Sequence, residues 1–299
     1  MISRTKPHKP DVAQIVTDQI LEALEQGVVP WQKPWKTCLP MNMVSKHQYH
    51  GINLLILSLS EYASPFYATF NQIAEMGGQV KPGSRAFRIV YWRLLEHINS
   101  QSGEVTEVPL MRYYCVFNLE QTTGIPAEKI PQIGKEINPI EACEAVFANM
   151  PNKPGLIVSR EAYYDRKEDV IGMPAREWFD SPEEHYSTLW HEAIHSTGHQ
   201  KRLDRDNSYE KAGFNAAYSN EELIAEIGSS FLCAYAGIAP MTIRNQAAYI
   251  DHWLKRLKGD KKLIIYAASA AQKAVDYILH EPGEINFNQC TWLGDYFNL

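Results

Sequence analysis

The stretch SPEEHYSTLWHEAIHSTGH, residues 181–199, determines our interpretation of this chain. Ser181 is a favourable N-cap, and Pro182 suits the first helical position because its missing N–H is not needed there. Glu184 completes a capping box, and Gly198 is suited to end the helix. The sequence therefore predicts a single helix of about 16 residues.

Two histidines of this helix have the spacing of metal ligands. His191 and His195 lie four residues apart, so both imidazoles project from one helical face and can bind the same divalent ion. Glu192 follows the first histidine and is placed to accept a proton from water at such a site. We expect zinc, with another divalent metal as the alternative, rather than a helix with two ordinary surface histidines.

The third ligand is sought in SNEELIAE, residues 219–226, which we expect to open a second helix over 220–236. Glu222 and Glu226 share one face of that helix, so one can bind the metal while the other hydrogen-bonds a ligand histidine. Glu222 has a second explanation, because it stands where the capping-box glutamate of a helix capped at Ser219 would stand. Resemblance to glutamate-type zincins assigns Glu222 to the metal and Glu226 to a ligand histidine, with Glu226 as the alternative ligand.

Another zincin arrangement, HExxHxxGxxH, is excluded by its last position. Gly198 matches the glycine of that pattern, but Lys201 stands where the third histidine belongs. His199 comes two residues too early. The acidic helix is therefore the better source of a ligand.

Composition narrows the class of protein. The chain has 299 residues, which fits two domains, and it contains no run of about 18 apolar residues. The N-terminal residues lack the apolar stretch of a signal peptide, so we expect a cytoplasmic protein with no membrane partner. Its five cysteines are widely spaced without a CxxC pair, which argues against disulfides and cysteine-rich zinc fingers.

Charge is unevenly distributed along the chain. Residues 1–135 contain 13 Lys and Arg against 11 Asp and Glu, whereas residues 136–299 contain 16 against 24. Nucleic acid is therefore a plausible partner for the first half alone.

Aromatic rings stand beside positive charge in two places of that first half. After a predicted helix at 10–27, Trp31 and Trp35 flank Lys33 in an extended, proline-containing segment. Such rings stack on nucleic-acid bases or pack over a small core, and the composition alone favours packing. Trp31, Lys33 and Trp35 are kept as candidate contacts with single-stranded DNA.

The second place is a predicted β-hairpin, with alternating strands at 85–93 and 108–118. A mixture of cations and rings of this kind suits single-stranded DNA, whose bases are open to stacking. An ordinary solvated strand face is the alternative. The candidate contacts in the hairpin are Arg85, Arg88, Trp92, Arg112 and Tyr113.

The rest of the chain is divided by a proline-punctuated segment at 124–139, which we interpret as a linker between domains at 1–123 and 140–299. Strands at 155–159, 162–166 and 169–173 are expected to build a small sheet beside the metal helix. Two amphipathic helices after Met241 are expected to support it.

Several of these segments together resemble a known family. Four segments of the first half are similar to the N-terminal domain of ArdC antirestriction proteins. They are VTDQILEALEQGVVPWQKPW, YHGIN, ATFNQIAEMGGQVKPGS and FNLEQTTGI. The stretch from HEAIHSTGH through RLDR to EELIAEIGSSFLCAYAGI resembles the metallopeptidase domain of the same family. The resemblance implies an α+β protein with a single-stranded-DNA-binding domain followed by a zincin-like metallopeptidase domain.

The function implied is antirestriction, the protection of incoming plasmid DNA from host restriction during conjugation. Its expected partners are single-stranded DNA and a protein substrate, with a host restriction-modification subunit as one candidate. The alternative is a DNA-binding shield without proteolysis, in which the metal is structural. The presence of Glu192 argues against that alternative, because a structural zinc site needs no such carboxylate.

Overall fold

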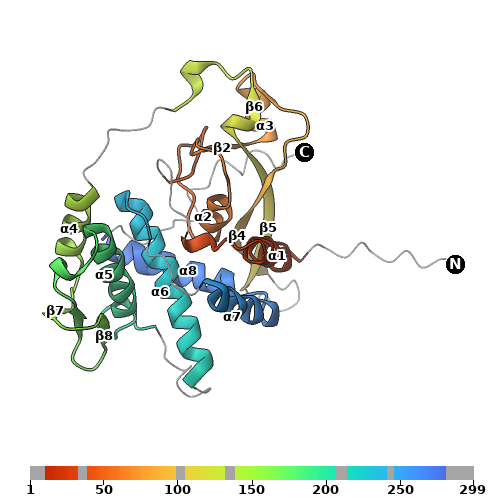
Figure 1. Cartoon of the computed structure of the whole chain (residues 1–299). Coiled ribbons are helices and arrows are strands. Elements are labelled where there is room, and N and C mark those ends of the chain that lie inside the picture. The colour runs from red at the N-terminus through yellow and green to blue at the C-terminus, as the bar shows by residue number, and fades with distance from the viewer. Residues whose placement is uncertain are drawn as a thin grey trace.

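The computed structural model describes residues 11–32, 39–98, 105–131, 139–205, 214–240 and 246–280, with the side chains at 93–98, 105–109, 214–219 and 246 not described. The fold is α+β, with two regions that correspond to the two halves of the sequence. Figure 1 shows a long β-hairpin with short helices in one region and a group of helices with a small sheet in the other.

The first region is built on a four-stranded sheet of order β1-β2-β5-β4. Its main feature is the predicted hairpin, which is confirmed and is longer than expected. Its strands pair antiparallel from Phe87 opposite Val116 to Ile98 opposite Val105. The polar turn between them lies outside the described residues. The strands of the sheet are β1 (Met41–Asn42), β2 (Phe66–Thr69), β4 (Phe87–Ile98) and β5 (Val105–Asn118).

Helices cover the outer edge of β4. The side chain of Asn53 accepts a hydrogen bond from Val90 N and donates one to Val90 O. Gln19 reaches the Arg88 carbonyl oxygen at 3.5 Å. These contacts satisfy backbone groups that an exposed edge strand would leave unpaired. The helices concerned are α1 (Val12–Glu25) and α2 (Ile52–Ser58), and the remaining elements of this region are η1 (Pro30–Gln32), α3 (Phe70–Glu75), β3 (Gln79–Val80), η2 (Leu119–Gln121), β6 (Thr122–Thr123) and η3 (Ala127–Lys129).

The second region contains a three-stranded sheet of order β7-β9-β8, in which β7 pairs parallel and β8 antiparallel with β9. The three strands predicted beside the metal helix are therefore confirmed. The elements are α4 (Pro139–Asn149), β7 (Gly155–Val158), β8 (Tyr163–Asp165), β9 (Val170–Met173), η4 (Arg176–Trp178), α5 (Pro182–Thr197), α6 (Phe214–Ala236), α7 (Gln246–Gly259) and α8 (Leu263–Ile278).

The helix α5 has the predicted bounds, with one change at its cap. Ser181 Oγ accepts from Glu184 N at 3.1 Å, as expected. The Glu184 side chain, however, accepts from Asp180 N rather than from Ser181 N. The Glu184 side chain therefore accepts from the backbone N–H one residue upstream of the N–H that a capping box uses.

The helix α6 differs more from the prediction. It begins at Phe214, so Ser219 lies inside the helix and is not its N-cap. Its end is as predicted, since Gly237 adopts a positive φ of 77° just after Ala236. Because the helix starts upstream, the explanation of Glu222 as a capping-box glutamate was wrong.

One hydrophobic core joins the two regions. It contains Val16, Ile20 and Leu55 from the first region together with Trp190 and Ile264 from the second. Thr17 Oγ1 also donates to Lys261 O at 2.7 Å, which ties α1 to the turn before α8. The predicted linker at 124–139 is described only in part, since 132–138 lie outside the described residues. Within the part of the chain that is described, no helix is long and apolar enough to cross a bilayer.

Candidate metal centre

The candidate metal centre lies between α5 and α6. The buried face of α5 carries Trp190 and Ile194, both fully covered by the core. Opposite Ile194 stands Gly228 of α6, where an added Cβ would come within 2.7 Å of Ile194 Cδ1. A glycine at this position lets the two helices approach closely enough for a carboxylate of α6 to reach the histidines of α5.

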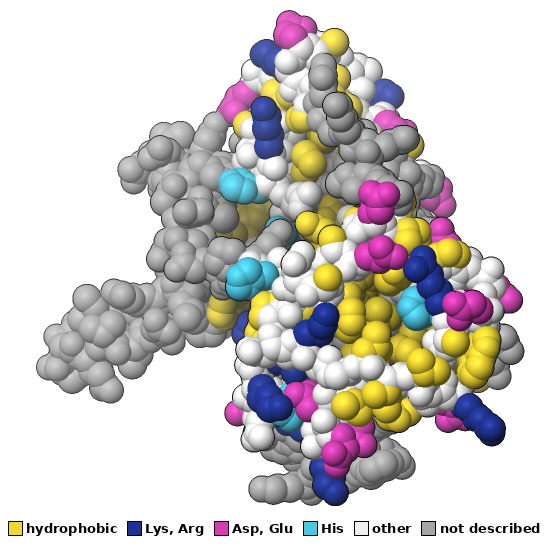
Figure 2. Space-filling model, turned by 90° about the vertical axis from the view of Figure 1, so that its left-hand side faces the viewer, with side chains coloured by type: hydrophobic (Ala, Val, Ile, Leu, Met, Phe, Trp, Pro, Cys, Tyr) yellow, Lys and Arg dark blue, Asp and Glu magenta, His cyan; other side chains and the backbone are white. Residues whose placement is uncertain are grey.

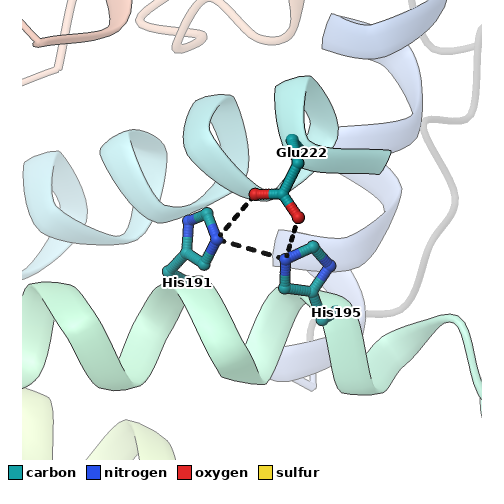
Figure 3. A group of neighbouring side chains, drawn as sticks. All are labelled: His191, His195 and Glu222. Atoms are coloured by element: carbon teal, nitrogen blue, oxygen red, sulfur yellow. Dashed lines mark hydrogen bonds and ion pairs between the residues drawn. The ribbon is translucent and has the colours of Figure 1, made fainter. Parts of the chain in front are cut away.

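His191, His195 and Glu222 come together at this crossing, as Figure 3 shows. Their candidate ligand atoms all lie within 4.8 Å of one another. His191 Nε2 is 3.3 Å from Glu222 Oε2, His195 Nε2 is 3.4 Å from Glu222 Oε1, and the two Nε2 atoms are 3.1 Å apart. Two imidazole nitrogens and one carboxylate that converge in this way fit the donor set of a catalytic zinc site.

The ionisation of these groups reflects their proximity. Burial alone would raise the pKa of Glu222, but hydrogen bonds from His191 and His195 hold it well below its usual range. Burial alone would lower the pKa of His195, but its carboxylate partners Glu221 and Glu222 raise that pKa to about 10. The carboxylates of Glu221 and Glu222 therefore favour the protonated form of His195.

A further carboxylate, which the sequence analysis did not single out, supports His195 from its other ring nitrogen. Glu221 Oε1 lies 3.6 Å from His195 Nδ1 and accepts from Arg205 Nη2 at 2.5 Å. Arg205 is in turn fixed by the Ile194 carbonyl oxygen at 2.9 Å and by the Thr197 hydroxyl. Glu221 thus occupies the place beside a ligand histidine in which the sequence analysis expected Glu226. The run of two glutamates before Leu223 was the only sequence signal for it.

Glu226 makes its described hydrogen bonds elsewhere. Its Oε2 accepts from Trp31 Nε1 at 3.0 Å and from the Tyr249 hydroxyl. Burial raises its pKa to about 7, although both hydrogen bonds act in the opposite direction. The expectation that Glu226 orients a ligand histidine was therefore wrong, because Glu221 faces the imidazole and Glu226 faces the first region of the chain.

Glu192 is buried beside the ligands. Burial raises the pKa of its carboxyl group, while the histidines and the backbone N–H of Tyr164 in β8 lower it. Burial beside the metal-site residues therefore favours the protonated form of Glu192 more than exposure to water would.

Two polar side chains that follow α5, Arg202 and His199, make their described contacts away from the metal-site residues. The Arg202 side chain is fully buried and pairs with Asp169, Tyr164 OH and Ser196 O. His199 Nδ1 accepts from Lys201 N at 3.2 Å.

The DNA-contact candidates are placed in several surroundings. Trp31 is 1% exposed, so its ring cannot stack on a base and its prediction as a DNA contact was wrong. It packs edge-on against Trp253 instead. Lys33 and Trp35 lie outside the described residues.

The hairpin divides the remaining candidates between its faces. Strand alternation and register put Arg88, Trp92 and Tyr113 on one face, all exposed. Arg112 lies on the other face opposite Tyr91, whose ring packs edge-on against Tyr114. Arg85 is exposed and precedes β4.

The fold and the site define a two-domain α+β protein with a zincin-like metal centre, and comparison with known proteins supports this class. A family model described as the N-terminal domain of the anti-restriction factor ArdC matches residues 10–117, and one described as a zincin-like metallopeptidase matches residues 141–270. The chain belongs to the ArdC family of antirestriction proteins. Two solved structures that resemble this chain are forms of one member of that family.

The two structures are of ArdC from plasmid R388. The metal-free form is 36% identical to this chain, has a TM-score of 0.74, and is matched over 90% of this chain and 97% of its own. The Mn(II)-bound form is 35% identical with a TM-score of 0.74, over 92% and 100%.

Curated relatives include two proteins named DNA primase TraC from Escherichia coli, 30% and 32% identical over 92% and 88% of this chain. The chain spans only 20% and 26% of the length of these two relatives. An uncharacterized protein, y4eC, from Sinorhizobium fredii is 29% identical over 96% of this chain and 97% of its own length.

Proposed function

We propose that this protein binds single-stranded DNA and carries a metal-dependent peptidase site, and that it protects incoming plasmid DNA from restriction. The observation that carries the enzymatic part is the convergence of His191, His195 and Glu222 beside the buried Glu192. A carboxylate with a raised pKa is not needed to hold a structural ion. It is needed where a proton must be moved.

We propose zinc as the ion. Two imidazole nitrogens and one carboxylate oxygen suit zinc, whereas magnesium prefers oxygen ligands alone. Manganese is a real competitor, because the homologous R388 protein has a Mn(II)-bound structure. A divalent ion held by these residues supplies Lewis-acid chemistry.

The chain's own residues divide the remaining work. Glu192 accepts a proton from the attacking water and passes it to the leaving amine. Glu221 and Arg205 hold the His195 ring in the orientation that directs Nε2 toward His191 and Glu222. The backbone N–H of Tyr164 fixes the Glu192 carboxylate and places β8 beside the reacting groups.

The substitution Glu192→Gln tests the peptidase proposal. It preserves the size of the side chain and leaves the three metal-binding residues in place. The variant is expected to retain one equivalent of metal and to lose protection of a plasmid transferred into a restricting recipient. Full protection with the metal still bound would favour the alternative, a DNA-binding shield with a structural ion.

The DNA-binding part of the proposal rests on the family match and on the hairpin. The face that carries Arg88, Trp92 and Tyr113 offers a cation and two exposed rings in neighbouring register positions. Rings of this kind contribute about 1–3 kcal/mol per stacked base. We propose that the entering strand binds along this face in the recipient cytoplasm.

Binding of a fluorescent single-stranded oligonucleotide tests this face. The double variant Arg88→Ala/Trp92→Ala is expected to weaken binding by about tenfold or more and to reduce its salt dependence. Arg112→Ala, on the opposite face, is the matched control. Equal losses in both variants would contradict the assignment of the face.

We propose that the peptidase substrate is a protein that encounters the entering DNA strand, with a restriction-modification subunit as the leading candidate. Incubation of the wild type and of Glu192→Gln with restriction subunits, followed by mass spectrometry of the fragments, tests this point. Cleavage by the wild type alone is the expected result.

A further inference from the structure

The aromatic ring of Phe70 lies at the surface of the first region. Phe70 is the first residue of α3 and is 60% exposed. Among the described residues, none of the three hydrophobic core clusters includes it. Single exposed rings are common on protein surfaces, so the position of this ring in the sheet decides whether it has a use.

The register of the sheet places Phe70 level with two exposed residues of the hairpin. β2 ends at Thr69, which lies opposite Val116 of β5, so the next position on β2 is level with Cys115. Cys115 lies directly opposite Arg88 of β4, and both residues are exposed. The backbone at Thr69 is still extended (φ −72°, ψ 163°), so the strand alternation continues for one more residue. Phe70 therefore lies on the face of Cys115 and Arg88, opposite to the face of the buried Val116.

Positive charge lies on both sides of this ring. Arg88 is two strands away, roughly 10 Å at the usual strand spacing. Lys46 is exposed in the turn that follows β1, and Gln72 of α3 holds this turn beside α3 by accepting a hydrogen bond from Asn42 at 3.1 Å. In the described part of the chain, neither Arg88 nor Lys46 forms an ion pair. Figure 2 views the molecule from the left-hand side of Figure 1 and shows cationic and hydrophobic side chains, among acidic ones, at the height of α3 and β6.

We propose that Phe70 stacks on a base of the bound DNA strand, with Arg88 and Lys46 contacting the phosphates on either side of it. This inference rests on the proposed binding of single-stranded DNA and adds a second stacking site to the hairpin face. Trp92 lies four residues beyond Arg88 on β4, so Trp92 and Phe70 are roughly 16 Å apart and the DNA crosses from β4 over β5 to β2. Rings placed between cations bind bases without regard to sequence, and they require bases that are not already paired in a duplex.

Substitutions at Phe70 test this site through the affinity for a fluorescent oligothymidine. Phe70→Ala is expected to weaken binding by about tenfold, and Phe70→Leu by nearly as much, because leucine is apolar but has no ring to stack. Phe70→Trp keeps a ring and is expected to retain most of the affinity. Trp178→Ala removes a 65% exposed ring of the second region and is the matched control, with no expected loss. Circular dichroism confirms that each variant is folded.

The failure of this inference and the failure of the proposed function give different results. If Arg88→Ala/Trp92→Ala weakens binding but Phe70→Ala does not, the DNA does not reach β2, and the inference is overturned while the proposed function stands. Full affinity in Phe70→Leu would overturn stacking at this position. A wild type without affinity for the oligonucleotide would contradict the proposed function as well.

Cys115 provides an independent measure of the path of the DNA. Its free, exposed thiol lies between Phe70 and Arg88 on the same face. The other described cysteines are buried, so in a Cys38→Ser/Cys290→Ser background a photoreactive maleimide labels Cys115 selectively. Irradiation is expected to crosslink the labelled protein to the oligonucleotide, and Phe70→Ala is expected to lower the yield severalfold. A labelled protein that binds the oligonucleotide without any crosslink would exclude a path across β5.

Discussion

The indole nitrogen of Trp31 donates a hydrogen bond of 3.0 Å to Glu226, one helical turn after the metal-site residue Glu222. The donor comes from the first region of the chain and the acceptor from the second. Tyr249 of α7 binds the same carboxylate oxygen. The first region of the chain is therefore connected to the metal-site helix α6 by this hydrogen bond as well as by the shared core.

Trp31→Phe removes the indole donor and leaves Glu226 with Tyr249 alone. We expect a loss of about 1–3 kcal/mol in the free energy of unfolding, because a buried carboxylate loses a partner. Urea denaturation measures this change. Trp92→Phe, the same substitution at an exposed ring, is the control and is expected to change stability by less than about 0.5 kcal/mol. Equal effects would show that the Trp31 hydrogen bond contributes nothing.

Glu221→Gln tests the support of His195. The substitution keeps the shape of the side chain but removes the charge that faces His195 Nδ1 and Arg205. Metal affinity is expected to fall about 10–100-fold, with the three ligands unchanged. Competition with a chelating dye measures this, and exposed Glu128→Gln is the control. Unchanged affinity would mean that Glu221 does not orient the ligand.

Metal uptake is expected to release a proton at neutral pH. In the metal-free protein His195 has a pKa of about 10, above its ordinary 6.5, so it is protonated at pH 7. A ligand imidazole must be neutral, so apparent affinity should rise by about tenfold per pH unit between roughly pH 7 and 9.

Calorimetry in two buffers of different ionisation enthalpy detects that proton directly. The raised pKa of His195 also affects the stability of the metal-free protein. The contribution of protonated His195 to its stability is complete below pH 6.5 and is lost as the pH rises through about 10. Binding heats independent of the buffer would contradict both expectations.

Asp169→Asn should be among the most damaging changes outside the metal site. The Arg202 side chain is completely buried against Asp169. Burial alone would raise the pKa of Asp169, but hydrogen bonds from Arg202 and Tyr164 hold that pKa well below its usual range. Asparagine tolerates the left-handed backbone at this position (φ 56°), so the change isolates the charge.

The expected loss is about 3–5 kcal/mol of unfolding free energy, because a buried guanidinium is left unpaired. Asp251→Asn breaks the exposed pair with Lys255 and is the matched control, with an expected loss below about 1 kcal/mol. A loss at Asp169 no larger than at Asp251 would contradict the importance of the buried pair.

Local patterns were sufficient to predict the elements that carry the site. The Ser181 cap, the spacing of His191 and His195, and the alternation of the hairpin are short-range signals, and each is present in the structure. Four-residue spacing left Glu222 and Glu226 as alternatives, and only the resemblance to glutamate-type zincins favoured Glu222, which the structure places beside the two histidines.

Contacts between distant segments could not be predicted in the same way. The partners of Glu226 are Trp31 and Tyr249, which lie far from it in the sequence, so helical spacing alone assigned it to the wrong neighbour. The start of α6 was also misplaced. Ser219 has a favourable capping side chain, but the helix continues upstream of it to Phe214.

The core shared by α1, α2 and the helices around the metal site limits how recombination can exchange the two regions of this chain. Recombination that exchanged one region alone would pair two packing surfaces that had not evolved together, and buried side chains such as Ile20 and Ile264 would meet unfamiliar neighbours. The matched segment in one TraC relative takes in 92% of this chain but only 20% of that protein. Both regions thus occur together as one block in that relative, as their shared core requires.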